Sequence, residues 1–333
     1  MHPPFRVFTR LVVPWFCVPA LHAAISIDTV PVAYPTGNVP YNYRIGTYEV
    51  TNAQYTAFLN AVAADDPHGL YHPAMARADI VAQGGGIVRS GSAGSYSYSV
   101  TAGGGNYPVR IVSFFDAARF CNWLTNGQPV GPSSLTTTES GMYYFGGVSQ
   151  PPNNQVVRLL NFQNGQNGVA LASRDEWYKA GHYDPARGPS FSNYWTYATQ
   201  SDQAPLATGP NDDYANSANY LNAVGGLTPV GSYELATSFF GTYDQSGNVW
   251  ELFDSFWDSG TGSNLRREGG GAWGTDAIHI SKNYASSSFP YDEYTDLGFR
   301  IVTLEPIPEP GLAGYASAFA CLLAFWRTRR AST

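Results

Sequence analysis

The sequence predicts an α+β protein with much irregular backbone, and two observations lead to that class. Three segments carry a helix-capping residue followed by apolar side chains at helical spacing, and short runs of β-type residues lie between them. The 333 residues include 35 Gly and 23 Pro, which favour turns and irregular chain. With 44% hydrophobic residues and no visible linker, we expect one domain around one core.

The first and last of these helices have clear start signals. Thr51 caps the first, and an acidic stop followed by proline at residues 65–67 ends it. Ser173 opens the last helix in a capping box with Glu176, which turns Trp177 toward the core. These signals are local, so we expect the helices at these positions whatever the rest of the fold is.

The middle helix explains the cysteine that lies in the body of the chain. Ser113 caps this helix with Asp116 at the third helical position, and Cys121 falls on the same face as Phe120 and Leu124. The sequence has three cysteines, the other two being close to the chain ends: Cys17, Cys121 and Cys321. We expect Cys121 to be a buried core thiol rather than a nucleophile.

The segment between the first two helices is expected to be irregular. His68 and His72 have a spacing that on a helix would suit a metal, but the flanking prolines and glycine place them in a turn. No carboxylate follows them closely, so we do not predict a zinc or iron site. Residues 84–105 are rich in Gly and Ser around an alternating Tyr/Ser run, which predicts a surface hairpin.

Both chain ends have the composition of sorting signals. Residues 1–23 combine Arg6 and Arg10 with a short apolar run and end on Ala23, the pattern of a secretory signal peptide. A short N-terminal anchor is the alternative. At the other end Pro308-Glu309-Pro310 precedes apolar residues 311–326, a candidate transmembrane helix just under spanning length, and the segment closes with three arginines: Arg327, Arg329 and Arg330.

The C-terminal segment, residues 308–330, resembles the PEP-CTERM sorting signal of Gram-negative bacteria. That resemblance implies export, transient membrane contact, cleavage at the Pro-Glu-Pro by an exosortase, and release to the cell surface or exterior. A permanent C-terminal anchor is the alternative.

The net charge of the central region indicates which classes of partner it can bind. The formal charge of the chain is -7, but the end segments 1–23 and 311–333 hold five basic and no acidic residues. The remainder has 13 basic and 25 acidic residues, a net charge of -12. Nucleic acid and anionic membranes are poor partners for such a surface, and cations are better ones.

Residues 243–254 contain the most informative stretch, Tyr-Asp-Gln-Ser-Gly-Asn-Val-Trp-Glu-Leu-Phe-Asp. Asp244 and Glu251 flank a turn in which Gly247 can adopt positive φ, so the Gly247 and Val249 carbonyls can converge with both carboxylates. Mixed carboxylate and carbonyl oxygens suit calcium. The alternative is an ordinary β-turn that leads into a strand with its apolar side chains in the core.

This stretch is one of six motifs that occur in a fixed order, at residues 48–52, 108–124, 171–177, 247–251, 269–273 and 298–300. Together they resemble the formylglycine-generating enzyme family, the sulfatase-modifying factor domain, over residues 28–305. The resemblance implies a C-type-lectin-like fold with much irregular structure.

The resemblance also implies calcium. In that family the turn is a calcium loop, and the matching positions here are Asp244, Gly247, Val249 and Glu251. Residues 219–224 resemble the family's other calcium loop, with possible ligands from the Asn219 and Asn222 side chains and the Tyr220 and Val224 carbonyls. This second loop is short and has an amide where a carboxylate is usual, which predicts weaker binding or none.

The family's catalytic residues are missing. Aerobic formylglycine-generating enzymes use a copper-binding cysteine pair between the last two motifs, and no cysteine lies between Trp273 and Gly298 here. Thiolate copper chemistry is therefore unavailable. We expect a secreted, non-catalytic domain that binds calcium and an exterior ligand such as a polysaccharide or a peptide, since its Tyr- and Trp-rich loops suit sugar stacking. The alternative is an oxidoreductase-type enzyme with a non-cysteine site, for example His279 with Asp276 near Trp273.

Overall fold

The computed structural model describes residues 24–307, apart from 37, 189–192, 213 and 259–263. The predicted signal peptide and the predicted sorting tail, with its apolar run, lie outside these residues. In the part of the chain that is described, no helix has both the length and the apolar character that a membrane span requires.

The expected helices are present, and reciprocal capping boxes start them. The Thr51 side chain accepts from the Gln54 N–H, and the Gln54 side chain accepts from the Thr51 N–H at 2.9 Å. Ser113 and Ser173 begin their helices in the same way. The α-helices of the described residues are α1 (Asn52–Val62), α2 (Ala78–Ala82), α3 (Phe114–Thr125) and α4 (Arg174–His182).

Short strands form two four-stranded sheets and two small ribbons. One sheet has the order β1-β2-β12-β5 and the other β10-β9-β8-β11, while β3 pairs with β4 and β6 with β7. The strands are β1 (Thr29–Val32), β2 (Tyr43–Gly46), β3 (Ile87–Ser90), β4 (Ser97–Val100), β5 (Val169–Leu171), β6 (Leu206–Ala207), β7 (Ser217–Ala218), β8 (Trp250–Phe256), β9 (Arg266–Gly269), β10 (Ser286–Ser288), β11 (Leu297–Phe299) and β12 (Ile301–Thr303).

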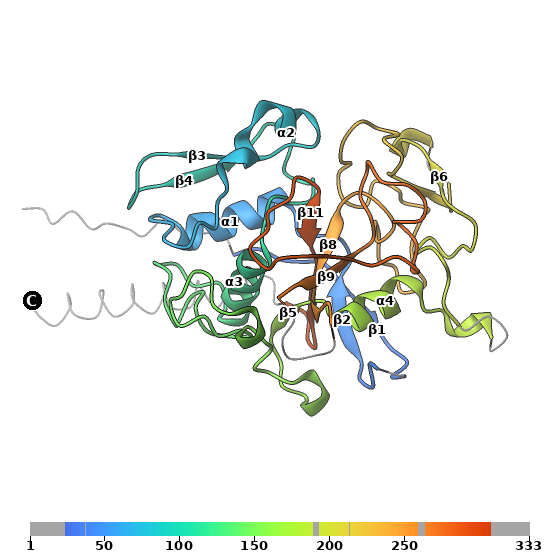
Figure 1. Ribbon diagram of the computed structural model, residues 1–333, viewed down its shortest axis with the longest axis horizontal. Coiled ribbons are helices and arrows are strands. Elements are labelled where there is room, and N and C mark those ends of the chain that lie inside the picture. Colours follow the sequence, from blue (N-terminus) through green and yellow to red (C-terminus); the bar gives the residue numbers. More distant parts are fainter. Residues whose placement is uncertain (1–23, 37, 189–192, 213, 259–263, 308–333) are drawn as a thin grey trace, which may run out of the picture.

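The sheets join segments that are far apart in the sequence. In the first sheet Ile45 of β2 lies opposite Val302 of β12, so the beginning and the end of the domain are paired directly. In the second sheet β11 runs parallel to β8, with Gly298 opposite Glu251. Figure 1 shows β8, β9 and β11 passing through the middle of the molecule. The last two motifs of the sequence therefore flank the turn that precedes β8.

The core is built from aromatic rings where helices meet strands. Phe58 of α1 packs edge-on against Phe120 of α3 at 5.4 Å, and Phe120 packs against Phe299 of β11 at 5.5 Å. Cys121 is fully buried beside Phe120, which confirms its predicted place in the core. These contacts fix the helices to the strand that ends next to the candidate site.

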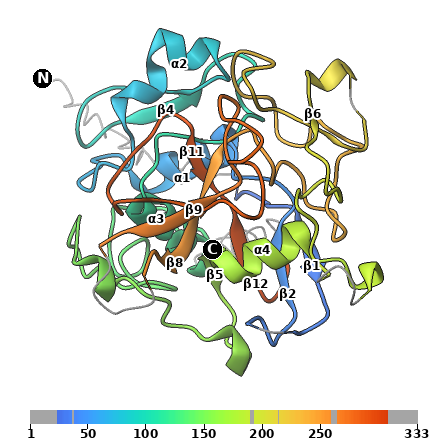
Figure 2. The same ribbon diagram turned by 45° about the vertical axis from the view of Figure 1, so that its right-hand side comes forward.

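The hairpin and the irregular chain lie on different sides of this core. The predicted hairpin is formed by β3 and β4, which pack over α1, and the Tyr98 hydroxyl donates to the Ala63 carbonyl at 2.8 Å. One face of this hairpin is therefore buried. The irregular chain that carries β6 gathers elsewhere, beside the loops around β8 (Figures 1 and 2). The result is an α+β fold with few helices, small sheets and much irregular structure.

Candidate functional site

The turn before β8 is held in an uncommon backbone conformation. Asp244, Gly247 and Asn248 all have positive φ, at 63°, 108° and 62°. A side chain on Gly247 would place its Cβ 2.4 Å from the Asn219 carbonyl oxygen, so only glycine fits. The Asn248 N–H donates to that same carbonyl at 2.9 Å. The turn is thus attached to the loop at Asn219.

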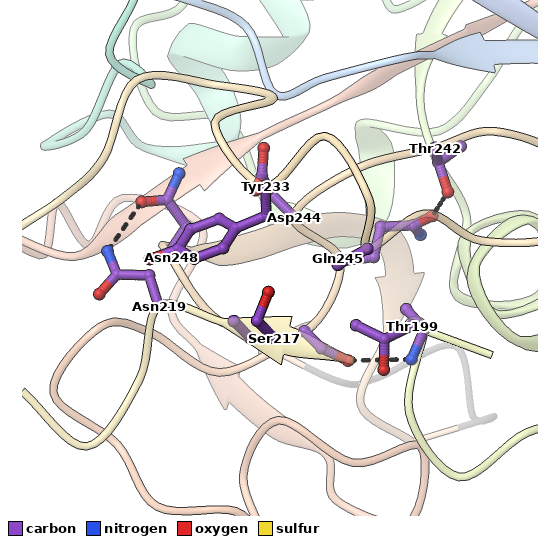
Figure 3. Close-up of a pocket in the computed structure, with 12 residues that line it drawn as sticks. Thr199, Ser217, Asn219, Tyr233, Thr242, Asp244, Gln245 and Asn248 are labelled. Atoms are coloured by element: carbon purple, nitrogen blue, oxygen red, sulfur yellow. Dashed lines mark hydrogen bonds between the residues drawn. The ribbon is translucent and has the colours of Figure 1, made fainter. Parts of the chain in front are cut away.

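A small cavity lies where the turn meets this loop. Its volume of about 10 Å³ is enough for about one water-sized body. Asn219 and Asp244, which come from the two predicted calcium loops, both line it, together with Ser217 and Asn248 (Figure 3). The sequence assigned these residues to two separate sites, whereas the structure places them in the wall of one cavity.

The side-chain oxygen of Asn219 has no hydrogen-bond donor among the described residues. The Nδ2 group donates to the Gly226 carbonyl at 2.9 Å and to the Asn248 side-chain oxygen at 3.4 Å (Figure 3). The Oδ1 atom is buried, and no hydrogen-bond partner for it exists among the described residues. Asp244 contributes a carboxylate whose Oδ2 accepts from the Gly231 N–H at 2.6 Å. A buried acceptor without a donor is costly unless a cation or water satisfies it.

Two further carboxylates lie close to the turn. Arg300 donates to both oxygens of Glu251, from Nε at 2.7 Å and from Nη2 at 2.8 Å. Glu49 accepts from Asn248 Nδ2 at 3.0 Å through Oε1, while its Oε2 is buried without a hydrogen-bond partner, 3.8 Å from Arg300 Nη2. Glu49 and Glu251 are both almost completely buried.

The cluster carries more negative than positive charge. Glu49, Asp244 and Glu251 face a single guanidinium, that of Arg300. Burial raises the pKa of Glu49 well above its usual value, the nearby Asp244 and Glu251 carboxylates raise it further, and Arg300 opposes them. Such a cluster favours uptake of either a proton or a cation.

The residues fit calcium only if neutral oxygens take part. Within the described residues, no three His, Cys, Asp or Glu side chains are gathered closely enough to hold a metal by themselves. Calcium, however, accepts amide and carbonyl oxygens, and an ionised carboxylate that already binds Arg keeps free lone pairs. The Asn219 Oδ1 and the Asp244 carboxylate, which line the same cavity, are therefore suitable donors, while Glu49 and Glu251 do not line it.

The residues of the second predicted calcium loop lie in two different environments. Asn219 and Tyr220 are buried, and the Tyr220 hydroxyl donates to the Pro205 carbonyl at 2.6 Å. Asn222 and Val224 are exposed on the surface. Of this loop, Asn219 is the residue that lines the cavity shared with Asp244.

A larger groove lies elsewhere, between the start of α3 and the segment that follows β10. A cavity of about 390 Å³ is lined by Phe115, Phe289 and Tyr291 together with three prolines: Pro151, Pro152 and Pro290. The Phe289 and Tyr291 rings stack with their centroids 5.3 Å apart and an angle of 5° between their planes. They are 43% and 48% exposed, so the pair presents flat aromatic surface to solvent.

The two histidines of the predicted turn are paired with distant glutamates. His68 Nε2 lies 3.4 Å from Glu139 Oε1, and His72 Nε2 lies 4.0 Å from Glu293 Oε2. Burial lowers the pKa of His68, and the neighbouring Arg119 lowers it further. We did not predict these partners, because no short spacing in the sequence connects a glutamate with either histidine.

The alternative site suggested by the sequence is partly assembled. His279 Nδ1 lies 2.6 Å from Asp276 Oδ1, and this hydrogen bond lowers the pKa of Asp276. The ring of His279 packs against Tyr284 at 4.3 Å and against Trp250 at 6.0 Å. The rings of Trp250 and Tyr284 are therefore aromatic neighbours of this pair.

The thiol of Cys121 is poorly placed for chemistry. Its side chain is fully buried within α3, and burial raises its pKa well above the usual value. A protonated, enclosed thiol is neither a nucleophile nor a copper ligand.

Few helices, small twisted sheets and long irregular loops around a central turn define a C-type-lectin-like protein of the sulfatase-modifying-factor type. The chain belongs to this family, since residues 32–304 match the sulfatase-modifying factor enzyme 1-like domain. No curated protein matches the chain.

The chain is similar to solved structures at low sequence identity. CarF is 22% identical with a TM-score of 0.50, and the match covers 84% of this chain and 98% of CarF. Treponema denticola variable protein 1 is 18% identical with a TM-score of 0.48, over 85% of this chain and 93% of that protein. PvdO from Pseudomonas aeruginosa is 17% identical with a TM-score of 0.44, over 84% and 91%.

Proposed function

We propose that this chain is an exported, non-catalytic member of the family that holds calcium and binds an extracellular polysaccharide. The stacked wall of Phe289 and Tyr291 carries the ligand assignment. Its parallel rings lie in a groove and remain nearly half exposed, which is costly for a surface that has no partner. Flat aromatic surface with adjacent polar groups suits the faces of sugar rings.

Calcium is supported by the cavity at the turn. Asn219 Oδ1 is a buried acceptor to which no described residue donates, and the Asp244 carboxylate in the same cavity is one of three that share the guanidinium of Arg300. A divalent cation would relieve both conditions at once. When bound, calcium would join the turn at Asp244 to the loop at Asn219, and so stiffen the irregular side of the molecule.

The positions of the cysteines support a protein without catalytic activity. Cys121 is buried in α3 and does not line the groove. Cys17 and Cys321 belong to the end segments that we expect to be removed. Binding without turnover therefore agrees best with the groove.

Export is supported by the sequence of the two end segments. A signal peptide at residues 1–23 and the Pro308-Glu309-Pro310 segment would send the chain outward and make an exosortase its processing partner. Mass spectrometry of the extracellular protein tests this, and we expect its last peptide to end near residue 310. An extracellular peptide that contains Cys321 would contradict it.

The polysaccharide proposal is tested by affinity electrophoresis with polysaccharide extracted from the producing cells. We expect retardation of the wild-type protein and a several-fold loss of affinity for Tyr291→Ala, because the variant removes one of the two flat aromatic rings. Tyr144→Ala is the matched control, since Tyr144 is 53% exposed and lies outside the groove. Equal retardation of the two variants would rule out the groove as the binding site.

An oxidoreductase-type enzyme is the second candidate, favoured by the 2.6 Å contact between Asp276 and His279. This pair can orient an imidazole for proton transfer, while electron transfer would need an added redox cofactor. A substrate turnover that is lost in His279→Gln but unaffected by Tyr291→Ala would favour this candidate.

A further inference from the structure

A second cavity adjoins the aromatic wall, and its lining is chemically distinct. This cavity has a volume of about 310 Å³ and shares Phe115 and Tyr291 with the groove. Its other walls carry His72, Asp116 and Glu293. The two spaces therefore form a continuous surface with an aromatic half and an acidic half.

The acidic half has no strong cation to balance it. Among the described residues that line either cavity, none is Lys or Arg. Glu293 faces His72 across 4.0 Å, which is too long for a hydrogen bond, and its side chain is 23% exposed and so can be reached from solvent. Behind it, Asp116 is buried and accepts from the Ser113 N–H and hydroxyl.

Burial and the neighbouring acidic groups disfavour ionisation of the carboxyl groups in this cavity. Burial, together with the nearby Asp116 and Asp66 carboxyl groups, raises the pKa of Glu293 to about 8. Burial likewise raises the pKa of Asp116 to about 6 in spite of its hydrogen bonds with Ser113. A ligand that brings positive charge would relieve this repulsion.

We propose that the cavity at Glu293 and His72 receives the protonated amine of an amino sugar whose neighbouring ring lies on Tyr291. The inference rests on the polysaccharide binding proposed above and specifies its chemistry. Glu293 releases its proton when the ammonium group binds and then supplies the charged acceptor.

The lining favours an amino sugar over a lysine-containing peptide. Three of the residues that line the aromatic half are prolines, which have no N–H to donate to a peptide carbonyl: Pro151, Pro152 and Pro290. Peptides that bind by adding a strand depend on such main-chain hydrogen bonds. The parallel rings of Phe289 and Tyr291 instead match the flat face of a sugar ring.

The test compares two oligosaccharides that differ only at the nitrogen, a glucosamine oligomer and the N-acetylglucosamine oligomer of the same length. By titration calorimetry at neutral pH we expect the free amine to bind at least about tenfold more tightly, which corresponds to about 1.4 kcal/mol. Glu293→Gln should remove this preference. Glu305→Gln makes the same change at an exposed position outside both cavities and should keep it.

Circular dichroism first establishes that each variant is folded, and Tyr291→Ala should weaken both oligomers alike. Equal binding of the two oligomers would overturn the amine site and leave polysaccharide binding in place. Tighter binding of a lysine peptide than of the glucosamine oligomer would also overturn it. If the wild-type protein binds none of the polysaccharides tested, the proposed function is overturned, and the amine site with it.

Discussion

Arg300 holds Glu251 through two nearly parallel hydrogen bonds, at 2.7 and 2.8 Å, in the interior of the protein. Arg300 also donates to the carbonyls of Gly46, Thr47 and Tyr243. It therefore connects the end of β2, the turn before β8 and the segment between β11 and β12. The guanidinium of Arg300 thus holds these three parts of the chain together next to the candidate calcium cavity.

We predict that Glu251→Gln destabilises the protein by about 1.5–3 kcal/mol, because Arg300 loses charge-assisted hydrogen bonds to Glu251 and keeps Glu49, 3.8 Å away, as a neighbouring carboxylate. The free energy of unfolding by urea, monitored by tryptophan fluorescence, measures this loss. Asp79→Asn is the matched control. It breaks the exposed pair of Asp79 with Arg77, whose loss should change stability little because solvent screens it. Equal effects of the two variants would mean that Arg300 does not organise this region.

The structure also shows which features local sequence could predict. The helices after Thr51, Ser113 and Ser173 followed from capping boxes, in which donor and acceptor lie three residues apart. The burial of Cys121 followed from helical periodicity. The family and its fold followed from ordered motifs, and residues 32–304 confirm the family.

Features that depend on distant pairing could not be predicted. The pairing of β2 with β12 joins the two ends of the domain, and neither strand carries a signal of its neighbour. In the same way, nothing near His72 indicates that Glu293 will face it. The motifs did indicate Asp244 and Asn219 separately, but their meeting in one cavity depends on the close approach at Gly247.

Glu293 should make stability fall as pH rises. Because its pKa in the folded protein is about 8, against 4.5 in the ordinary state, the folded protein binds this proton more tightly than the unfolded chain. The contribution is fully present below about pH 4.5 and is lost as pH rises toward about 8. We predict that Glu293→Gln raises the melting temperature relative to wild type at pH 8 but not at pH 4.5, measured by circular dichroism.

The matched control for this prediction is Glu305→Gln, at an exposed position. Its difference in melting temperature from wild type should be the same at both pH values. If Glu293→Gln behaves like this control, the carboxyl of Glu293 is not affected by Asp116 and Asp66 in the way that the geometry indicates.

We also predict that the purified domain forms no formylglycine. The reaction oxidises a substrate cysteine, and in this family the enzyme's own cysteine pair holds the copper that engages it. Cys121 is buried and its pKa is raised, so it cannot hold copper with a partner or reach a bound peptide. Mass spectrometry of a sulfatase-type cysteine peptide, incubated with and without copper, should show no conversion. Turnover that is abolished by Cys121→Ser would refute both the inactivity and the structural role of Cys121.

We place the proposed calcium in this cavity because the positive-φ turn at Asp244 and the buried oxygen of Asn219, to which no described residue donates, meet there. Binding to the folded state alone should stabilise it, by about 2.7 kcal/mol when calcium is present at 100 times its dissociation constant. Melting temperatures in calcium and in chelator measure this directly for wild type, Asn219→Ala and Asp244→Asn, with Asp79→Asn as the control. We predict a higher midpoint in calcium for wild type and for the control, and no difference for the two cavity variants. Equal midpoints for wild type in calcium and in chelator would contradict the claim.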